Sequence, residues 1–199
     1  AWGMAALIYT FVRVRTAAAV TAGILAAWWA LLLCVPSPDC PPGAWPMATV
    51  KNCITNWVDV HYLTVLHRHE GGLATLAMPP LVLMGMFAGA FIRASAGRLS
   101  GNRIAGALAG YGVALLALGF FGAFCLGPAS MPIIKGDYTS TYSLVSGGIA
   151  ALILAALYWI VDVKGFVAWS IYFRVIGANA LAVYFGGYFI GFDSIGRFF

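Results

Sequence analysis

The chain has 199 residues, of which 62% are hydrophobic and 9% are charged, and its mean hydropathy is +0.92. Soluble domains carry roughly a quarter charged residues, so this chain has too few to cover a surface that faces water. The formal net charge is +5, but the basic residues are spread along the chain, which argues against a nucleic-acid partner.

The apolar residues fall in runs of about twenty, the length that crosses the hydrocarbon core of a bilayer as a helix. Backbone polar groups in lipid must pair within their own segment, and strand-like alternation is absent, so we predict helices and no barrel. The sequence therefore predicts an all-α, polytopic transmembrane helical bundle that forms one domain over residues 1–199. Its six predicted helices are 1–12, 16–35, 72–92, 104–126, 141–161 and 166–190.

Two of these helices carry special features. The first is partial, because the chain opens at Ala1 inside an apolar stretch without the charged region of a signal peptide. We therefore expect these residues to be the C-terminal part of a longer membrane protein. The third should be kinked at Pro79 and Pro80, because each proline ring removes a donor and clashes with the preceding turn. A tight turn is predicted at residues 162–165.

The charged residues of the loops predict the orientation. One set of loop ends is rich in bases and contains a single acid, Asp162, whereas the other set has more acids than bases. The positive-inside rule makes the first set cytoplasmic. The outer loop 36–70, the loop 128–140 and the C-terminus then face the periplasm or a lumen. The bases of the cytoplasmic set are Arg13, Arg15, Arg93, Arg98, Arg103 and Lys164.

Small residues recur at the G-x-x-x-G spacing, which lets helix backbones approach closely in lipid. The three pairs are Gly85 with Gly89, Gly106 with Gly110, and Gly187 with Gly191. We interpret all three as helix-packing positions.

Four cysteines are present. Cys40 and Cys53 share the outer loop, where an oxidising compartment would allow them to form a disulfide. Cys34, at the end of a helix, is a competing partner for either of them. Cys125 lies inside a predicted helix and is interpreted as core packing. The spacing of the four is no zinc signature, and we expect no metal site.

All three histidines, His61, His67 and His69, lie in the outer loop beside Asp59 and Glu70. An imidazole there could exchange a proton with a substrate. A solvated loop at the headgroup level explains the same residues and is the simpler interpretation. No histidine falls inside a predicted span, which argues against haem ligation. No tightly bound cofactor is therefore expected.

Three polar residues are candidates for lining a ligand pathway. Arg174 falls within the last predicted helix, where its guanidinium suits a coenzyme phosphate, although it lies near enough to the cytoplasmic end to snorkel. Asn179 lies one turn deeper, where a buried amide needs a partner. Lys135 lies at the outer end of the fifth helix, where the hydroxyls of residues 139–141 can cap the N-terminus.

Five short segments carry a family resemblance. In order and spacing they resemble the C-terminal half of the heparan-alpha-glucosaminide N-acetyltransferase family, which has bacterial relatives associated with N-acetylglucosamine use. The resemblance covers most of residues 50–185. The segments are Asn52–Asp59, Glu70–Leu73, Pro132–Tyr142, Tyr158–Gly165 and Gly177–Ala180.

This resemblance implies a polytopic acetyltransferase of the bacterial inner membrane. Such an enzyme transfers acetyl from cytoplasmic acetyl-CoA, its co-substrate, to an amino sugar on the periplasmic side. Asn179, Lys135, Arg174 and Asp59 are the residues that would line the path of the substrates. The catalytic histidine of the family lies upstream of the part that this chain matches, so no catalytic residue is assigned and catalysis by this chain stays open. At Arg174 the relatives carry an apolar residue or proline.

Two other functions stay open. A non-catalytic accessory subunit of a larger membrane complex would suit the abrupt start and the aromatic content of seven Trp, nine Tyr and thirteen Phe. A sugar transporter ranks last, because no internal repeat is present. The expected partners are the lipid bilayer and, in a complex, other membrane subunits or a second copy in a homodimer.

Overall fold

The computed structural model describes residues 2–41, 53–62, 72–168 and 171–179. Over these ranges the protein is all-α, as predicted, and has no strand, although an isolated bridge pairs Pro36 with Cys53. The chain divides into two compact units, Ala1–Ala156 and Leu157–Phe199. The expectation of one domain over residues 1–199 stays a prediction.

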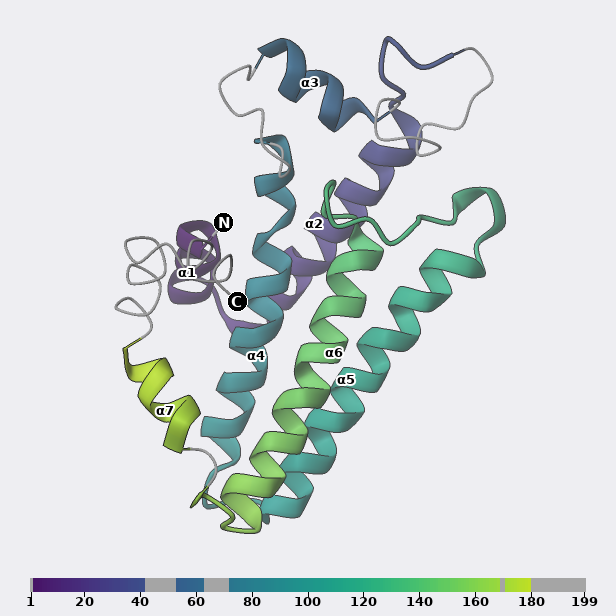
Figure 1. Ribbon diagram of the computed structural model, residues 1–199. Coiled ribbons are helices and arrows are strands. Elements are labelled where there is room, and N and C mark those ends of the chain that lie inside the picture. The colour runs from purple at the N-terminus through teal and green to yellow at the C-terminus, as the bar shows by residue number, and fades with distance from the viewer. Residues whose placement is uncertain (1, 42–52, 63–71, 169–170, 180–199) are drawn as a thin grey trace, which may run out of the picture. The chain divides into compact units, whose positions relative to one another are not determined.

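The first unit contains most of the helices (Figure 1). The 3₁₀ segment η3 (Leu73–Ala77) precedes α4, and the 3₁₀ segment η4 (Gly127–Ala129) follows α5. The last two residues of α6 belong to the second unit. The α-helices are α1 (Trp2–Phe11), α2 (Val14–Cys34), α3 (Ile54–Tyr62), α4 (Pro79–Ser95), α5 (Gly101–Phe124) and α6 (Ser140–Tyr158).

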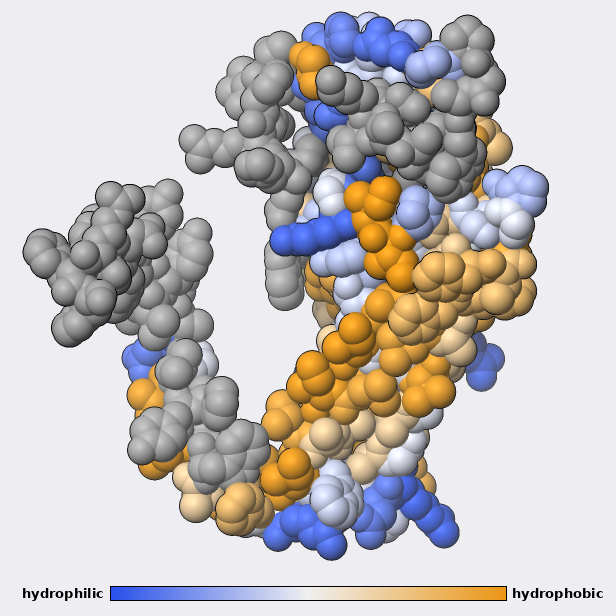
Figure 2. Space-filling view, turned by 45° about the vertical axis from the view of Figure 1, so that its right-hand side comes forward, coloured by the Kyte–Doolittle hydropathy of each residue, from blue (hydrophilic) through white to orange (hydrophobic). Residues whose placement is uncertain are grey.

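Four helical segments are long and apolar enough to cross a membrane: Val14–Cys34, Leu73–Ser95, Gly101–Phe124 and Ser140–Val163. They hold 21 to 24 residues each, so each spans roughly 32–36 Å at the rise of an α-helix. Most residues of these segments are not buried within the protein. Hydrophobic side chains cover the helices between hydrophilic groups at the two ends (Figure 2). The chain is therefore a multi-pass membrane protein, as the sequence predicted.

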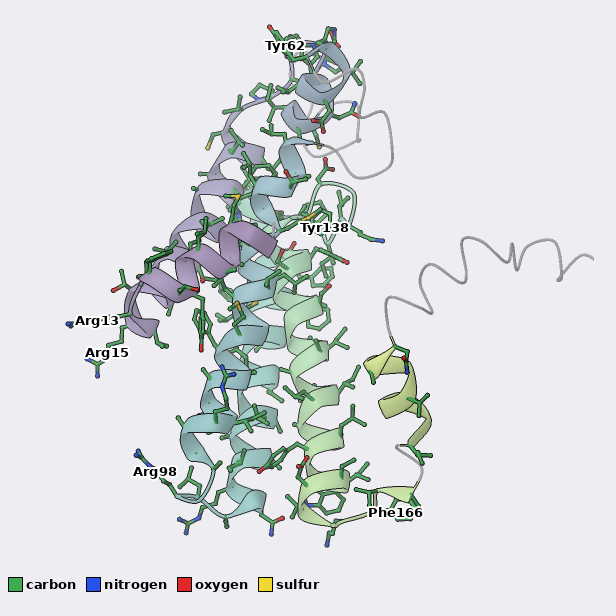
Figure 3. The ribbon with its side chains drawn as sticks, turned by 90° about the vertical axis from the view of Figure 1, so that its left-hand side faces the viewer. Arg13, Arg15, Tyr62, Arg98, Tyr138 and Phe166 are labelled. Atoms are coloured by element: carbon green, nitrogen blue, oxygen red, sulfur yellow. The ribbon has the colours of Figure 1, made fainter. Side chains whose placement is uncertain are left out.

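The α3 end of the first unit is the end where α2 finishes, α6 begins and α3 lies (Figure 1). Tyr62 lies at this end and Arg98 at the opposite one (Figure 3). The sequence missed α3, because it assigned residues 36–70 to an outer loop.

The Pro79–Pro80 pair marks a change of helix type. The predicted kinked helix 72–92 is a 3₁₀ turn, η3, followed by α4, which begins at Pro79. Both prolines occupy the first turn of α4. Backbone N–H groups have no intrahelical acceptor there, so the missing proline donors cost nothing.

The glycines that bring helices together are not the predicted ones. A Cβ at Gly85, Gly89, Gly106 or Gly110 would meet no described residue within 4 Å, so the predicted close packing at these two pairs is not found within the described part of the chain. The pair Gly187 and Gly191 lies outside the described residues.

The contact between α5 and α6 is instead made at Gly112 and Gly148. A Cβ built on Gly148 would lie 2.8 Å from the Gly112 carbonyl oxygen, and one on Gly112 would lie 2.9 Å from the Gly148 oxygen. The two backbones therefore touch directly at this point. Close approach of this kind replaces the hydrophobic driving force that lipid does not supply.

The second unit begins with a change of helix type as well. A π-helical segment, η5 (Trp159–Val163), continues α6, and Gly165 follows with a φ of +69°. A left-handed φ favours glycine, which has no Cβ to clash. Within the predicted helix 166–190 the structure describes α7 (Ile171–Ala178), and residues 180–190 lie outside the described residues.

Candidate functional site

A cluster of buried polar side chains lies at the α3 end of the first unit. Each of these side chains is exposed by 5% or less. Burying polar groups costs free energy unless they are hydrogen-bonded, so their partners define what the cluster does. The polar cluster consists of Thr55, Asp137, Thr139, Ser140, Thr141 and Ser143.

Asp137 is the charged member of the polar cluster. Its Oδ1 accepts a hydrogen bond of 2.7 Å from the Thr55 hydroxyl, and its backbone carbonyl accepts one of 3.1 Å from the indole Nε1 of Trp28. Its Oδ2 is buried and has no hydrogen-bond partner among the residues that the structure describes. Such an oxygen is unusual in a folded protein and retains the capacity to accept a donor from a ligand or a water molecule.

The start of α6 is capped by Thr139, as the sequence predicted for the hydroxyl run. The Thr139 Oγ1 accepts the N–H of Tyr142 at 3.3 Å and that of Ile134 at 3.1 Å. The Thr141 hydroxyl donates to the carbonyl of Pro132 at 3.0 Å. These bonds fix the loop before α6 against the first turn of the helix.

The same loop is fastened to α2. The Ser140 hydroxyl donates to the carbonyl of Leu25 at 2.7 Å, and the indole of Trp29 donates to the carbonyl of Ala129 at 3.1 Å. Together with the Trp28 bond, these contacts join α2 to residues 100 to 115 positions away. The loop between α5 and α6 is thus held rigidly at the α3 end.

Cys53 borders the polar cluster and is 1% exposed. Burial, and secondarily the charge of Asp137 and a hydrogen bond to it, raise the pKa of the Cys53 thiol to about 12. The thiolate is therefore scarce at neutral pH. Cys40 and Cys53 are both thiols here, and their disulfide stays a prediction. Cys125 was wrongly interpreted as core packing, because it follows α5 and is exposed.

Asp59, a predicted lining residue, lies on α3 and is half-buried. Its Oδ1 accepts the N–H of Leu73, the first residue of η3, at 3.0 Å. Asp59 thus ties α3 to the segment that leads into α4, which is a structural task.

The described histidine, His61, engages its own helix. Its Nδ1 lies 2.9 Å from the Trp57 carbonyl oxygen, and its ring stacks on the Trp57 ring with centroids 4.4 Å apart. His67 and His69 lie outside the described residues. Within the part of the chain that the structure describes, no three His, Cys, Asp or Glu side chains are grouped to hold a metal ion.

Lys135 is exposed and lies in the same turn as Asp137. Its carbonyl oxygen accepts the N–H of Tyr138, which has a φ of 45°. A left-handed φ is uncommon outside glycine and costs of order 1–3 kcal/mol. This strained turn (Figure 3 labels Tyr138) sets the position of the Asp137 side chain.

Arg174 and Asn179 belong to the second unit, whereas Lys135 and Asp59 belong to the first. The Asn179 amide is exposed and donates to the carbonyl of Val175 at 2.9 Å, within its own helix turn. Arg174 lies on α7, and its side chain is outside the described part of the structure. The polar cluster was missed by sequence reasoning, although its hydroxyl run was noticed.

No protein-family model, curated protein or solved structure matches the chain.

Proposed function

We propose that the chain is the membrane-embedded part of an acyltransferase. In this proposal it transfers an acetyl group from acetyl-CoA on the cytoplasmic side to an amino sugar on the periplasmic side. The polar cluster around Asp137 binds the acceptor amine. The proposal stands on the family resemblance of the sequence together with the arrangement of the segments that carry it.

The observation that carries the proposal is that three of the resembling segments are bonded to one another. The segment Asn52–Asp59 is joined to Pro132–Tyr142 by the bond between Thr55 and Asp137, which are 82 positions apart. Asp59 in turn binds Leu73, the last residue of the segment Glu70–Leu73. Two of these segments thus meet at the buried carboxylate of Asp137.

The chemistry of the polar cluster suits a cationic acceptor. An amino sugar carries an ammonium group at neutral pH, and the unpartnered Asp137 Oδ2 is an acceptor for its N–H donors. Charge-assisted hydrogen bonds of this kind are about twice as strong as neutral ones. Because Oδ2 is buried, the proposal requires α3 to move away from Asp137 when the sugar enters.

The reaction needs a base as well as the acceptor site. The amine must lose a proton before its nitrogen attacks the acetyl carbonyl carbon. The new C–N bond then forms while the C–S bond breaks, and coenzyme A leaves as the thiol after protonation. We assign the proton acceptor to no residue of this chain.

The test uses the full-length protein in sealed phosphatidylcholine vesicles, with acetyl-CoA on the Arg98 side and glucosamine on the α3 side. Coenzyme A release and acetylated sugar are both measured. We expect turnover that Asp137→Asn lowers by at least about tenfold, the loss expected when a charge-assisted bond is removed. The matched control, Asp39→Asn, changes an exposed acid of the 36–70 segment and should leave turnover unchanged.

The outcomes separate two functions. Coenzyme A release that requires an amino sugar supports the transferase. No release with any amino sugar overturns it and favours the accessory subunit. The stacked Phe120 and Phe124 rings, 6.2 Å apart on an exposed part of α5, suit a partner helix in that case. Copurification with other membrane subunits in fixed stoichiometry would then establish the accessory role.

A further inference from the structure

An apolar groove runs between α2 and α5 within the membrane-spanning part of the first unit. Its volume is about 480 Å³. Most of the α5 side is a helical stripe at intervals of three and four residues, the spacing of one helix face. This α5 stripe consists of Tyr111, Leu115, Leu118 and Gly122.

A matching stripe lies on α2, where the same spacing recurs over the same number of residues. Phe121 of α5, Leu126 after it, Met84 and Phe87 of α4, and Leu144 of α6 complete the walls. The lining is therefore shared by four membrane-spanning helices. The α2 stripe consists of Ala18, Thr21, Ala22, Leu25 and Trp29.

The dimensions of the groove suit a single hydrocarbon chain. Both stripes cover eleven helical steps, which is roughly 16 Å and about half of the hydrocarbon core of a bilayer. A volume of about 480 Å³ over this length leaves room for an apolar chain alongside α2 and α5.

The polar atoms along the groove are already engaged. The Thr21 hydroxyl donates to the carbonyl of Ala17 at 2.8 Å, and the Tyr111 hydroxyl donates to the carbonyl of Met84 at 3.4 Å. The Trp29 indole donates to the carbonyl of Ala129. The groove therefore selects for an apolar occupant, since a polar one would lose its hydration without gaining bonds.

The groove is continuous with the lipid-facing surface at its side. Near the α3 end the Trp29 ring packs directly against Gly122, where a Cβ would clash with it. Leu118 and Phe121 line the groove and are still 57% and 54% exposed. In a bundle whose exposed apolar surface meets the bilayer, an acyl chain reaches the groove directly from the membrane.

We propose that this groove binds one acyl chain of a bilayer phospholipid. The acyl chain fills the space between α2 and α5, because the side chains that line an empty volume would lose dispersion contacts. It thereby holds α2 against the bundle as a structural lipid. This proposal holds whether or not the protein is a transferase.

The experiment uses the full-length protein in phosphatidylcholine vesicles that contain a phosphatidylcholine with a diazirine in the middle of one acyl chain. After illumination, labelled peptides are identified by mass spectrometry. We expect the label to concentrate on the α2 and α5 stripes, at several times the level on Ile149 and Ile153. Those two side chains are exposed on α6 and line no part of the groove.

A pair of variants tests occupancy. Ala22→Phe places a ring inside the groove and should lower the labelling of the α5 stripe several-fold. Ala27→Phe is the matched control, because Ala27 is exposed on α2 and points about 140° away from Ala22 around the helix. Thermal unfolding and size-exclusion profiles of both variants show whether they remain folded.

Three results would overturn the proposal. One is labelling spread evenly over all exposed positions of the wild-type protein, which needs no variant to detect. Another is unchanged labelling in folded Ala22→Phe. The third is a crosslink from a photoreactive amino acid at position 118 to another protein chain, which would make the occupant a protein.

Discussion

The α3 end of the first unit and its membrane-spanning middle are held together in different ways. At the α3 end, distant segments are joined by directional bonds, such as those of Thr55 and Trp28 to Asp137. In the middle, α5 and α6 meet backbone to backbone at Gly112 and Gly148. The difference follows the medium, because buried polar groups demand partners, whereas helices in lipid gain from close packing alone.

The exclusion of water from the interior of the α3 end is tested by the reactivity of the Cys53 thiol. With a pKa of about 12 in place of 9.0, its thiolate fraction at pH 8 is lower by on the order of a thousandfold. We expect alkylation of the reduced protein, in a variant that keeps Cys53 alone, to be slowed accordingly. Because the raised pKa favours the protonated thiol, the rate should keep rising as the pH increases from 9 toward 12. A plateau near pH 9 would mean that water reaches this residue.

The glycine contact in the middle is tested by Gly148→Ala. The added Cβ would meet the Gly112 carbonyl oxygen at 2.8 Å, and a backbone atom cannot rotate away. We expect the free energy of unfolding, measured in mixed micelles, to fall by about 3 kcal/mol, at the upper end of overpacking costs. In the control Gly110→Ala, the added Cβ meets no described residue within 4 Å, so this substitution should be neutral or slightly stabilising. Equal effects of the two substitutions would show that the contact between Gly112 and Gly148 does not stabilise the protein.

The directional bonds of the α3 end are tested by Asp137→Ala. This change leaves the buried Thr55 hydroxyl without its acceptor and should lower the free energy of unfolding by about 2 kcal/mol. Asp137→Asn keeps an oxygen at that position and should cost less. The exposed Asp39→Ala serves as the control and should be close to neutral. A stable Asp137→Ala protein would show that the bonds are incidental to the fold.

The smallest expected effect is that of Asp59→Ala. It removes the acceptor for the Leu73 N–H at the start of η3 and should cost about 1 kcal/mol, as the loss of a helix cap does. Asp59→Asn retains a side-chain oxygen and should recover most of the loss. Thermal unfolding of the three proteins compares them directly, and a cost as large as that of Gly148→Ala would contradict this ranking.

The long spans were predictable because their apolar runs are as long as a bilayer is thick. The bounds of α2 and α5 differ from the predicted ones by three residues or fewer. The nine-residue α3 was not predicted, since a short helix inside a polar segment has no comparable signal. The G-x-x-x-G spacing did not identify the contact between Gly112 and Gly148, because the spacing does not say which face of a helix meets a neighbour.

The polar cluster depends on contacts that the linear sequence does not contain. Asp137 is buried by residues 82 and 109 positions away, so in chain order it resembles any acid of a loop. The available signal was the unbroken run of hydroxyls from Thr139 to Thr141, two positions after an acid. The cap at Thr139 was predictable from that run, because capping is a local property.

The adjacent indoles of Trp28 and Trp29 have a mechanical consequence. Neighbouring side chains leave a helix about 100° apart, yet both donate to carbonyls of the single connection between α5 and α6. Twisting α2 about its axis would stretch one of these links while relaxing the other. Helix and connection must therefore shift as one piece, and any pivot for that shift has to lie at the opposite end, beside Arg13, where α1 gives way to α2.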